Sequence, residues 1–213
     1  MSPRPLIALD ADGVLLDYNL AYAKAWAKAM GTYPAERDPN AYWAVDRWDV
    51  ERLEGERLEK FRSTFDVEFW STIPPMESAV DACHRLHDHG YELVCVTALQ
   101  DYLVDARLKN LRSHGFPIEK VFATSSVMVE RSPKADILNQ LRPAAFVDDY
   151  LPYMQGVDQS IHRALILREP NGSPNAGPDV GRVSSKHLNL TEFAGWWTAT
   201  SPPLPNGARD GIG

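Results

Sequence analysis

Residues 5–17 read PLIALDADGVLLD, a short apolar run followed by two aspartates and a glycine. The run has the length of a buried strand, and Gly13 allows the backbone to turn sharply straight after it. Asp10 and Asp12 are two residues apart, so their side chains lie on the same side of an extended chain. Two neighbouring carboxylates repel each other unless a cation or a phosphate-binding role offsets the repulsion. The stretch therefore predicts a strand whose carboxyl end carries an acidic site.

Further apolar runs read as buried strands, and amphipathic helical patterns separate them. The predicted strands after the first are residues 92–96, 120–123, 144–147 and 164–167. In the predicted helix over 101–114, the apolar stripe consists of Val104, Leu108 and Leu111. Strands and helices that alternate at this spacing predict an α/β fold, with a mostly parallel sheet and helices on both faces. Ligands bind such sheets at the carboxyl ends of the strands.

Composition narrows the class of protein and its partners. Of the 213 residues, 44% are hydrophobic and 24% are charged, which is ordinary for a globular protein. A formal net charge of −7 argues against polymeric nucleic acid or an anionic membrane as the main partner. Cys83 and Cys95 fall in apolar patterns, so buried thiols are expected and a disulfide is not. With no apolar run long enough for a signal peptide or a membrane span, we expect a cytoplasmic protein.

Three more features follow later strands, at the same edge of the predicted sheet. Thr97 ends the second strand, and its hydroxyl can hold a phosphate oxygen. Lys134 begins a helix in the sequence SPK, and its charge can neutralise both a phosphate and a carboxylate. Asp148 and Asp149 directly follow an apolar strand and form a suitable site for a hard cation. Each feature has an ordinary structural explanation by itself, but together they predict one site.

The motifs LDADGVLLD, VCVTA, SPKADIL and FVDDY, within residues 5–160, resemble those of the haloacid dehalogenase-like hydrolase superfamily. The resemblance implies a doubly wound, Rossmann-like α/β sheet, one Mg²⁺ and an aspartyl-phosphate intermediate. Asp10 would be the nucleophile and Asp12 the general acid/base. The dehalogenase branch lacks the second aspartate of the first motif, so Asp12 indicates phosphate chemistry.

The same resemblance assigns the ligands of the phosphate and of the metal. Thr97, Ala98 and Lys134 would bind phosphate, although Ala98 offers no polar side chain. The metal ligands would be Asp10, the backbone carbonyl of Asp12, and Asp149, with Asp148 beside them, directly or through water. A phosphate dianion repels a carboxylate, so attack by Asp10 needs Mg²⁺ and Lys134 to neutralise charge.

Residues 18–72 interrupt the alternation of strands and helices. Helices are predicted over 18–30, near 41–46 and over 48–62. This insertion follows the first strand, where it can cover the active-site end of the sheet. We therefore expect a helical cap at 18–72, a core domain formed by 1–17 and 73–198, and a mobile tail at 199–213.

The predicted cap is rich in aromatic residues, which either form its own core or, in one or two cases, stack on a flat substrate moiety. They are Tyr18, Tyr22, Trp26, Trp43, Trp48, Phe61, Phe65, Phe69 and Trp70. The segment FWSTIPPMESAVDACHRLHDHGYELVCVT, with DADGVLLDY before it, looks like the 5′(3′)-deoxyribonucleotidase branch of the superfamily. The chain departs from that branch after Thr97, where Ala98 and Leu99 offer no polar side chain to a phosphate. A nucleoside monophosphate is one candidate.

The sequence thus predicts a Mg²⁺-dependent phosphohydrolase that acts on a small phosphorylated metabolite, as a monomer or homodimer. A phosphotransferase or mutase of the same superfamily and a non-catalytic phosphate-binding relative are the alternatives. Receiver domains use similar residues, but they place the acidic pair first along the chain, whereas Asp148 and Asp149 come last here.

Overall fold

The computed structural model describes residues 4–124, 126–128 and 130–201. Within these residues, parallel strands form one six-stranded sheet in the order β3-β2-β1-β4-β5-β6. The strands are β1 Leu6–Leu9, β2 Glu92–Ala98, β3 Ile118–Thr124, β4 Ala145–Asp148, β5 His162–Ile166 and β6 Ser185–His187. From β1 the chain builds the sheet first on one side and then on the other. The predicted doubly wound α/β fold is therefore confirmed, with its topological switch point between β1 and β4.

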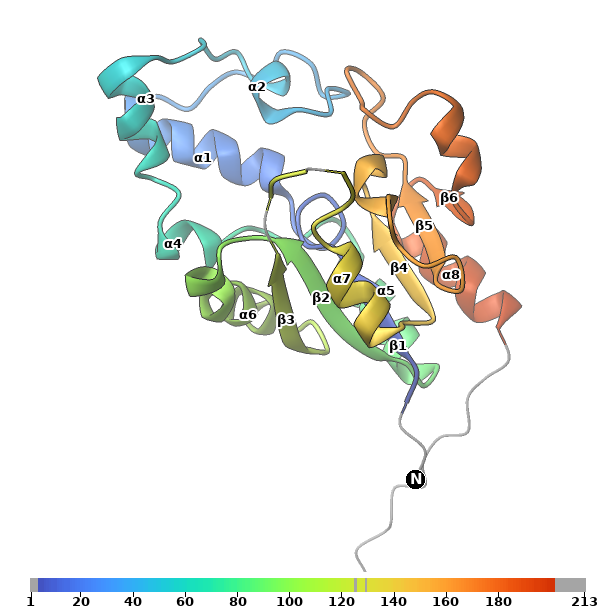
Figure 1. The fold of residues 1–213 in the computed structure, drawn as a ribbon. Coiled ribbons are helices and arrows are strands. Elements are labelled where there is room, and N and C mark those ends of the chain that lie inside the picture. Colours follow the sequence, from blue (N-terminus) through green and yellow to red (C-terminus); the bar gives the residue numbers. More distant parts are fainter. Residues whose placement is uncertain (1–3, 125, 129, 202–213) are drawn as a thin grey trace, which may run out of the picture.

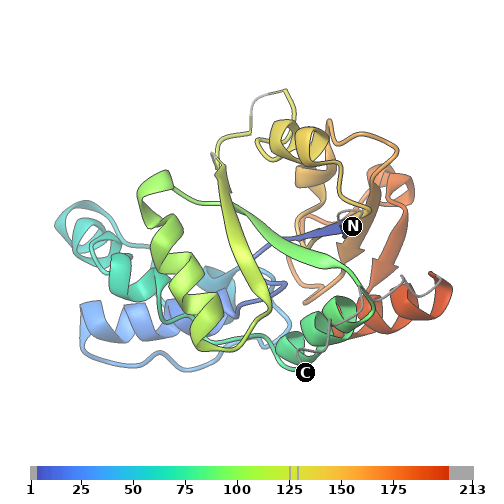
Figure 2. The same cartoon turned by 90° about the horizontal axis from the view of Figure 1, so that it is seen from below.

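Helices cover both faces of the sheet. They are α1 Tyr18–Met30, α2 Ala44–Arg47, α3 Gly55–Arg62, α4 Val67–Trp70, α5 Ala79–Asp88, α6 Val104–Ser113, α7 Ala135–Leu141 and α8 Leu190–Thr200, with short 3₁₀ helices η1 Asp101–Leu103, η2 Leu151–Met154 and η3 Pro178–Arg182. Successive residues of β1 face opposite sides, so Ile7 and Leu9 join one apolar core and Ala8 joins the other. Seen from below, α7 lies on one side of the strands while α5 and α8 lie on the other (Figure 2).

The insertion after β1 consists of α1 to α4, and it lies beyond the end of the sheet where the strands stop (Figure 1). The helix α1 has the predicted bounds. It begins after Asp17, whose carboxylate accepts a hydrogen bond from the backbone N–H of Leu20 at 2.8 Å. It ends at Gly31, which adopts a left-handed conformation with φ of 82°.

Most aromatic residues of the insertion pack against one another, as the core interpretation predicts. The rings of Tyr22 and Phe61 are 5.1 Å apart, and those of Phe65 and Phe69 are 4.7 Å apart. Trp26 packs edge-on against Phe61 at 5.5 Å. These rings join the core cluster that also packs against the sheet, so the insertion rests on the body of the protein through an apolar interface.

Some predicted boundaries are wrong, for identifiable reasons. The predicted helix over 48–62 begins only at Gly55, because Trp48 is extended and pairs with Glu36 in an antiparallel bridge. Its indole N–H donates to the Asn19 carbonyl at 2.8 Å, which fixes this extended segment against α1. The strand β6 was not predicted, because three residues of the sequence SKH give no apolar run. At the other end, α8 extends to Thr200, and residues 202–213 of the predicted tail lie outside the described residues.

The helices of the described residues are too short or too polar to cross a bilayer. Cys83 and Cys95 are both buried free thiols, as predicted.

Candidate active site

Three carboxylates meet where β1 and β4 end. Asp10 follows β1 directly, and its backbone N–H donates to the Val147 carbonyl of β4 at 2.9 Å. Asp148 ends β4 and Asp149 follows it. Oxygens of the three carboxylates lie within 4.8 Å of one another, and all three residues are buried. The structure therefore brings these three predicted site residues together.

A buried lysine holds two of these carboxylates. Lys134 is the residue that precedes α7, and its Nζ lies 2.6 Å from Asp10 Oδ1 and 2.7 Å from Asp148 Oδ2. The residue has no exposed surface. Burial alone would lower the pKa of Lys134, but the two carboxylates beside it raise that pKa above its ordinary value. Lys134 is therefore a permanent positive charge under Asp10.

Asp12 has a different cation as its partner. Nη2 of Arg107, in α6, lies 2.9 Å from each of the two carboxylate oxygens of Asp12. The Arg107 side chain is fully buried, whereas that of Asp12 is 26% exposed. Burial raises the pKa of Asp12 above its ordinary value, and the Arg107 guanidinium opposes this shift. Asp10 and Asp12, although only two residues apart, are thus held by cations that come from opposite faces of the sheet.

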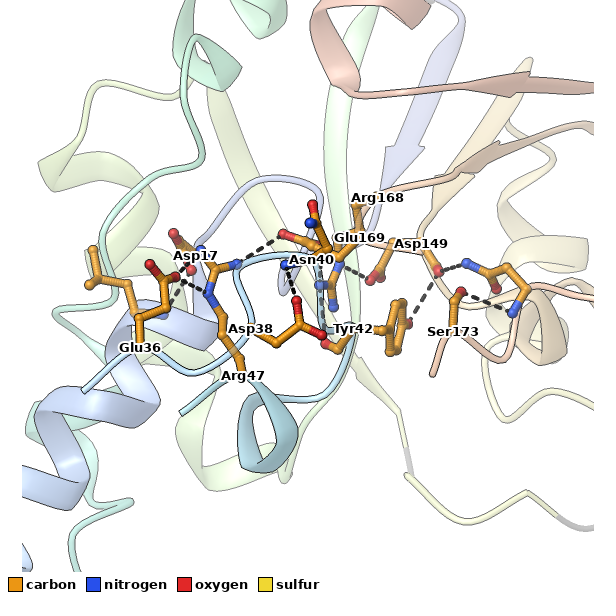
Figure 3. Close-up of polar contacts among 12 residues, drawn as sticks. Asp17, Glu36, Asp38, Asn40, Tyr42, Arg47, Asp149, Arg168, Glu169 and Ser173 are labelled. Carbon is orange, nitrogen blue, oxygen red and sulfur yellow. Dashed lines mark hydrogen bonds and ion pairs between the residues drawn. The ribbon is translucent and has the colours of Figure 1, made fainter. Parts of the chain in front are cut away.

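A third cation, Arg168, holds Asp149 and at the same time contacts the insertion (Figure 3). Its Nε lies 2.5 Å from Asp149 Oδ2, and its Nη1 donates to the Tyr42 carbonyl at 3.3 Å. The guanidinium carbon lies 4.2 Å from the centre of the Tyr42 ring. The Tyr42 hydroxyl in turn donates to the backbone carbonyl of Asp149 at 3.2 Å. A residue of the insertion therefore contacts Asp149 directly and also through Arg168.

Backbone hydrogen bonds dock the same part of the insertion on the loop after β5. The N–H of Tyr42 donates to the Asn171 carbonyl, and the N–H of Asn171 donates to the Asn40 carbonyl, both at 2.9 Å. The Asn171 amide also donates to the Asp38 carboxylate at 2.9 Å. Such paired bonds fix the register of the two segments, so Tyr42 is held in place from both sides.

A cavity of about 450 Å³ opens beside the carboxylates. Predicted site residues that line it are Asp10, Asp12, Thr97, Ala98 and Asp149. Lys134 contacts both Asp10 and Asp148. Neither Lys134 nor Asp148 lines the cavity, because both are fully buried. Aromatic side chains make up much of the remaining wall: Tyr18, Tyr42, Trp43, Trp70, Tyr150 and Tyr153. The cavity therefore joins an acidic floor to aromatic walls.

No protein-family model matches the sequence, and no curated protein matches it significantly. Solved structures do match. A HAD-family hydrolase from Deinococcus radiodurans R1, with bound phosphate and sodium, matches with a TM-score of 0.62 at 13% identity, over 96% of this chain and 100% of that one. A predicted phosphoglycolate phosphatase from Haemophilus somnus gives 0.60 at 14% identity, over 92% and 99%. The L-2-haloacid dehalogenase from Xanthobacter autotrophicus gives 0.56 at 12% identity, over 93% and 100%.

The chain has the haloacid dehalogenase-like fold. Proteins described as phosphatases and as dehalogenases share this fold among the matched structures, so the fold by itself does not decide the reaction. The site residues must decide it.

The acidic site of this haloacid dehalogenase-like fold fits a divalent cation. Lys134 engages Oδ1 of Asp10 and Arg168 engages Oδ2 of Asp149, and within the described part of the chain Oδ2 of Asp10 accepts no hydrogen bond. Carboxylate oxygens are the ligands that Mg²⁺ prefers. Gly13 leaves the necessary room, because a Cβ there would collide with the Asp149 carboxylate and with Arg168.

Sequence reasoning missed three residues of the site: Arg107, Arg168 and Tyr42. Arg107 belongs to the buried face of α6, which carries Ala106, Arg107, Asn110 and Leu111. The predicted stripe was wrong in part, since Val104 and Leu108 are only half-buried. A signal was present, because the buried positions follow helical spacing once polar residues are allowed in the stripe. Arg168 lies two residues after Ile166, the last residue of β5, and follows the apolar Leu167, which is also a recognisable position.

Proposed function

We propose that this protein is a Mg²⁺-dependent phosphohydrolase that acts on a small phosphate monoester through a phosphorylated Asp10. The observation that carries the proposal is the setting of Asp10. Its carboxylate lines the cavity, contacts Lys134 at 2.6 Å and has the oxygens of Asp148 and Asp149 within 4.8 Å. An anionic nucleophile that attacks an anionic phosphate needs positive charge concentrated at this place.

Phosphate transfer would begin with Asp10. One carboxylate oxygen forms a bond to phosphorus as the bond from phosphorus to the leaving oxygen breaks. Lys134 reduces the repulsion between the two anions, and Thr97, with Ala98 beside it, binds the phosphate oxygens at the cavity wall. Mg²⁺, when bound, supplies further neutralising charge. Its ligands would be Asp10, Asp149 and the backbone carbonyl of Asp12, with Asp148 directly or through water.

Asp12 would transfer the protons. It protonates the leaving oxygen in the first step and deprotonates the water that hydrolyses the phosphorylated Asp10 in the second. Burial, which raises the pKa of Asp12, supports its carrying a proton at the start of the reaction. An acid at this position can protonate an alkoxide as it leaves, whereas a halide leaves as an anion and needs no proton. Asp12 therefore favours phosphate chemistry over dehalogenation.

We infer that residues 18–72 act as a cap over a core domain of residues 1–17 and 73–198, and that the cap selects the leaving group. Tyr18, Trp43 and Trp70 of the cap line the cavity. The volume of about 450 Å³ suits a small molecule. Flat aromatic walls favour a flat moiety, so a nucleoside monophosphate is the substrate class that we propose.

The first experiment is turnover of an aryl phosphate with Mg²⁺. We expect release of inorganic phosphate, and its loss in Asp10→Asn, while Asp81→Asn, an exposed aspartate of α5, keeps the activity. Transfer of phosphate to an added alcohol instead of water would indicate the phosphotransferase alternative. Neither turnover nor a phosphorylated enzyme would mean a non-catalytic phosphate-binding relative.

The second experiment compares nucleoside monophosphates with small aliphatic phosphates by kcat/KM. Stacking of a base on an aromatic ring contributes about 1–3 kcal/mol, or roughly 5- to 150-fold. Trp43→Leu should reduce kcat/KM for the nucleotides by such a factor and leave the aliphatic esters unchanged. Trp196→Leu, a similarly exposed tryptophan of α8, is the matched control. Equal kcat/KM for both substrate classes in the unmodified protein would refute the nucleotide proposal.

A further inference from the structure

Arg107 is a buried charge in an unusual setting. Its side chain has no exposed surface, and its Nη2 donates to both oxygens of Asp12. Its guanidinium carbon lies 5.1 Å from the centre of the Trp70 ring, and Trp70 also lines the cavity. Arg107 therefore lies between the proposed acid/base and an aromatic wall of the substrate cavity.

Stability alone does not explain this arrangement. A buried guanidinium loses its hydration, and hydrogen bonds to all its donors are needed to recover that loss. Nε and Nη1 of Arg107, however, have no hydrogen-bond partner within the described residues. Among the described residues, the hydrogen bonds of this guanidinium come from Nη2 alone, the nitrogen that faces Asp12. The side chain is thus arranged for its contact with Asp12 rather than for full hydrogen bonding.

The two bonds from one nitrogen define where the carboxyl group of Asp12 lies. Without them, a short side chain that is 26% exposed can rotate away from the cavity. The bonds are also compatible with proton transfer. When one oxygen of Asp12 carries the proton, the other still accepts from Nη2, so the carboxyl group keeps its orientation in both protonation states.

We propose that Arg107 is the positioning residue for Asp12, and that it directs the carboxyl group of Asp12 at the leaving oxygen of a substrate whose leaving group contacts Trp70. This inference rests on the proposed function of Asp12 as general acid/base. In the first step the proton moves from Asp12 to the leaving oxygen as the bond to phosphorus breaks. A displacement of about 1 Å in such a group can cost on the order of 100-fold in rate.

The test is a double-mutant cycle on the phosphorylation step, measured in single turnovers with an alkyl and an aryl phosphate. Arg107→Gln should slow phosphorylation by the alkyl ester about 10- to 100-fold and by the aryl ester only slightly, because a phenolate leaves without much protonation. Arg107→Lys should recover part of the loss. In an Asp12→Asn background, Arg107→Gln should have no further effect. Arg112→Gln, an exposed arginine of the same helix, is the control.

The outcomes of this cycle distinguish a positioning role of Arg107 from a purely structural one. An equal loss for both esters, or a full further loss in the Asp12→Asn background, would mean that Arg107 only supports the fold, and the inference would be wrong. If Asp12→Asn itself shows no dependence on the leaving group, the proposed function of Asp12 fails, independently of Arg107. If circular dichroism shows that Arg107→Gln does not fold, the same cycle is measured with Arg107→Lys. A lysine keeps the buried positive charge but cannot donate to both oxygens of Asp12 in the same geometry. This variant must therefore still slow phosphorylation by the alkyl ester more than by the aryl ester.

Discussion

Arg168→Met should make the stability of the protein depend much more strongly on Mg²⁺. In the unmodified protein Arg168 Nε lies 2.5 Å from Asp149 Oδ2, and the Asp149 side chain is only 4% exposed. Methionine keeps the apolar stem of the side chain but removes the charge. The variant then holds a buried carboxylate without this counter-charge, next to Asp10 and Asp148.

The expected magnitude follows from burial. Removing one partner of a buried ion pair costs about 3–5 kcal/mol, because the other charge stays buried and uncompensated. For a chain of this length, about 1 kcal/mol corresponds to roughly 2–4 °C in Tm, so Tm should fall by about 6–20 °C without metal. Mg²⁺ restores positive charge beside Asp149 and no longer competes with a guanidinium. The increase in Tm on adding Mg²⁺ should therefore be larger in Arg168→Met than in the unmodified protein.

Thermal melts with and without saturating Mg²⁺ are the measurement. Arg182→Met is the control, because the side chain of Arg182 forms an exposed ion pair with Asp179. It should change neither Tm nor the response to Mg²⁺ appreciably. The reasoning is refuted if Mg²⁺ raises Tm equally in Arg168→Met and in the unmodified protein, since the cation would then not share the charge of Asp149 with Arg168.

Three further predictions follow from the same site and from the distant edge of the sheet. Chelation should abolish phosphatase activity, and Ca²⁺ should inhibit because its larger, looser coordination shell misplaces the nucleophile; full activity in excess chelator would contradict the mechanism. Gly13→Ala should lower Tm and abolish the stabilisation by Mg²⁺ in thermal melts, because φ is 86° there and the new Cβ collides with Asp149. Burial lowers the pKa of His162 and of His187, whose rings share the Ser185 hydroxyl at 2.8 Å. Their contribution to stability should thus be complete above about pH 6.5 and disappear as the pH falls through the folded-state pKa; Tm measured across this range should fall less steeply in His187→Gln.

The predictable part of the site is the part carried by strand ends. Asp10, Thr97 and the pair Asp148–Asp149 each follow an apolar run, and the carboxyl ends of parallel strands meet at one edge of a sheet. Lys134 was predictable because it begins a helix that follows such a strand. For these residues the local sequence pattern predicts both the strand or helix and the end of it at which the residue lies. Convergence in space then follows from the topology alone.

The contacts between the insertion and the loop after β5 could not be predicted in this way. Tyr42 and Arg168 are 126 positions apart in the sequence, and neither lies in a periodic pattern that would indicate which residue it contacts. The bonds between Asn171 and Asn40 join two irregular segments through the backbone, which any sequence can supply. Only the folded chain brings these segments together. The strand β6 escaped prediction for a related reason, since its polar residues pair only with one neighbour at the edge of the sheet.

Charge balance explains why three separate cations surround the site. Lys134 contacts Asp10 and Asp148, Arg107 contacts Asp12, and Arg168 contacts Asp149, so four aspartates face three positive groups; Glu169, the second partner of Arg168, is itself paired with Arg47. With all four aspartates ionised, this set carries one excess negative charge, which favours a divalent cation. With that cation the excess becomes positive by one, or by two when Asp12 carries its proton, which favours a phosphate dianion. Loss of any one of the three cations would remove one of these positive charges from the loaded site, so each should matter for phosphate binding even where it never touches the phosphate.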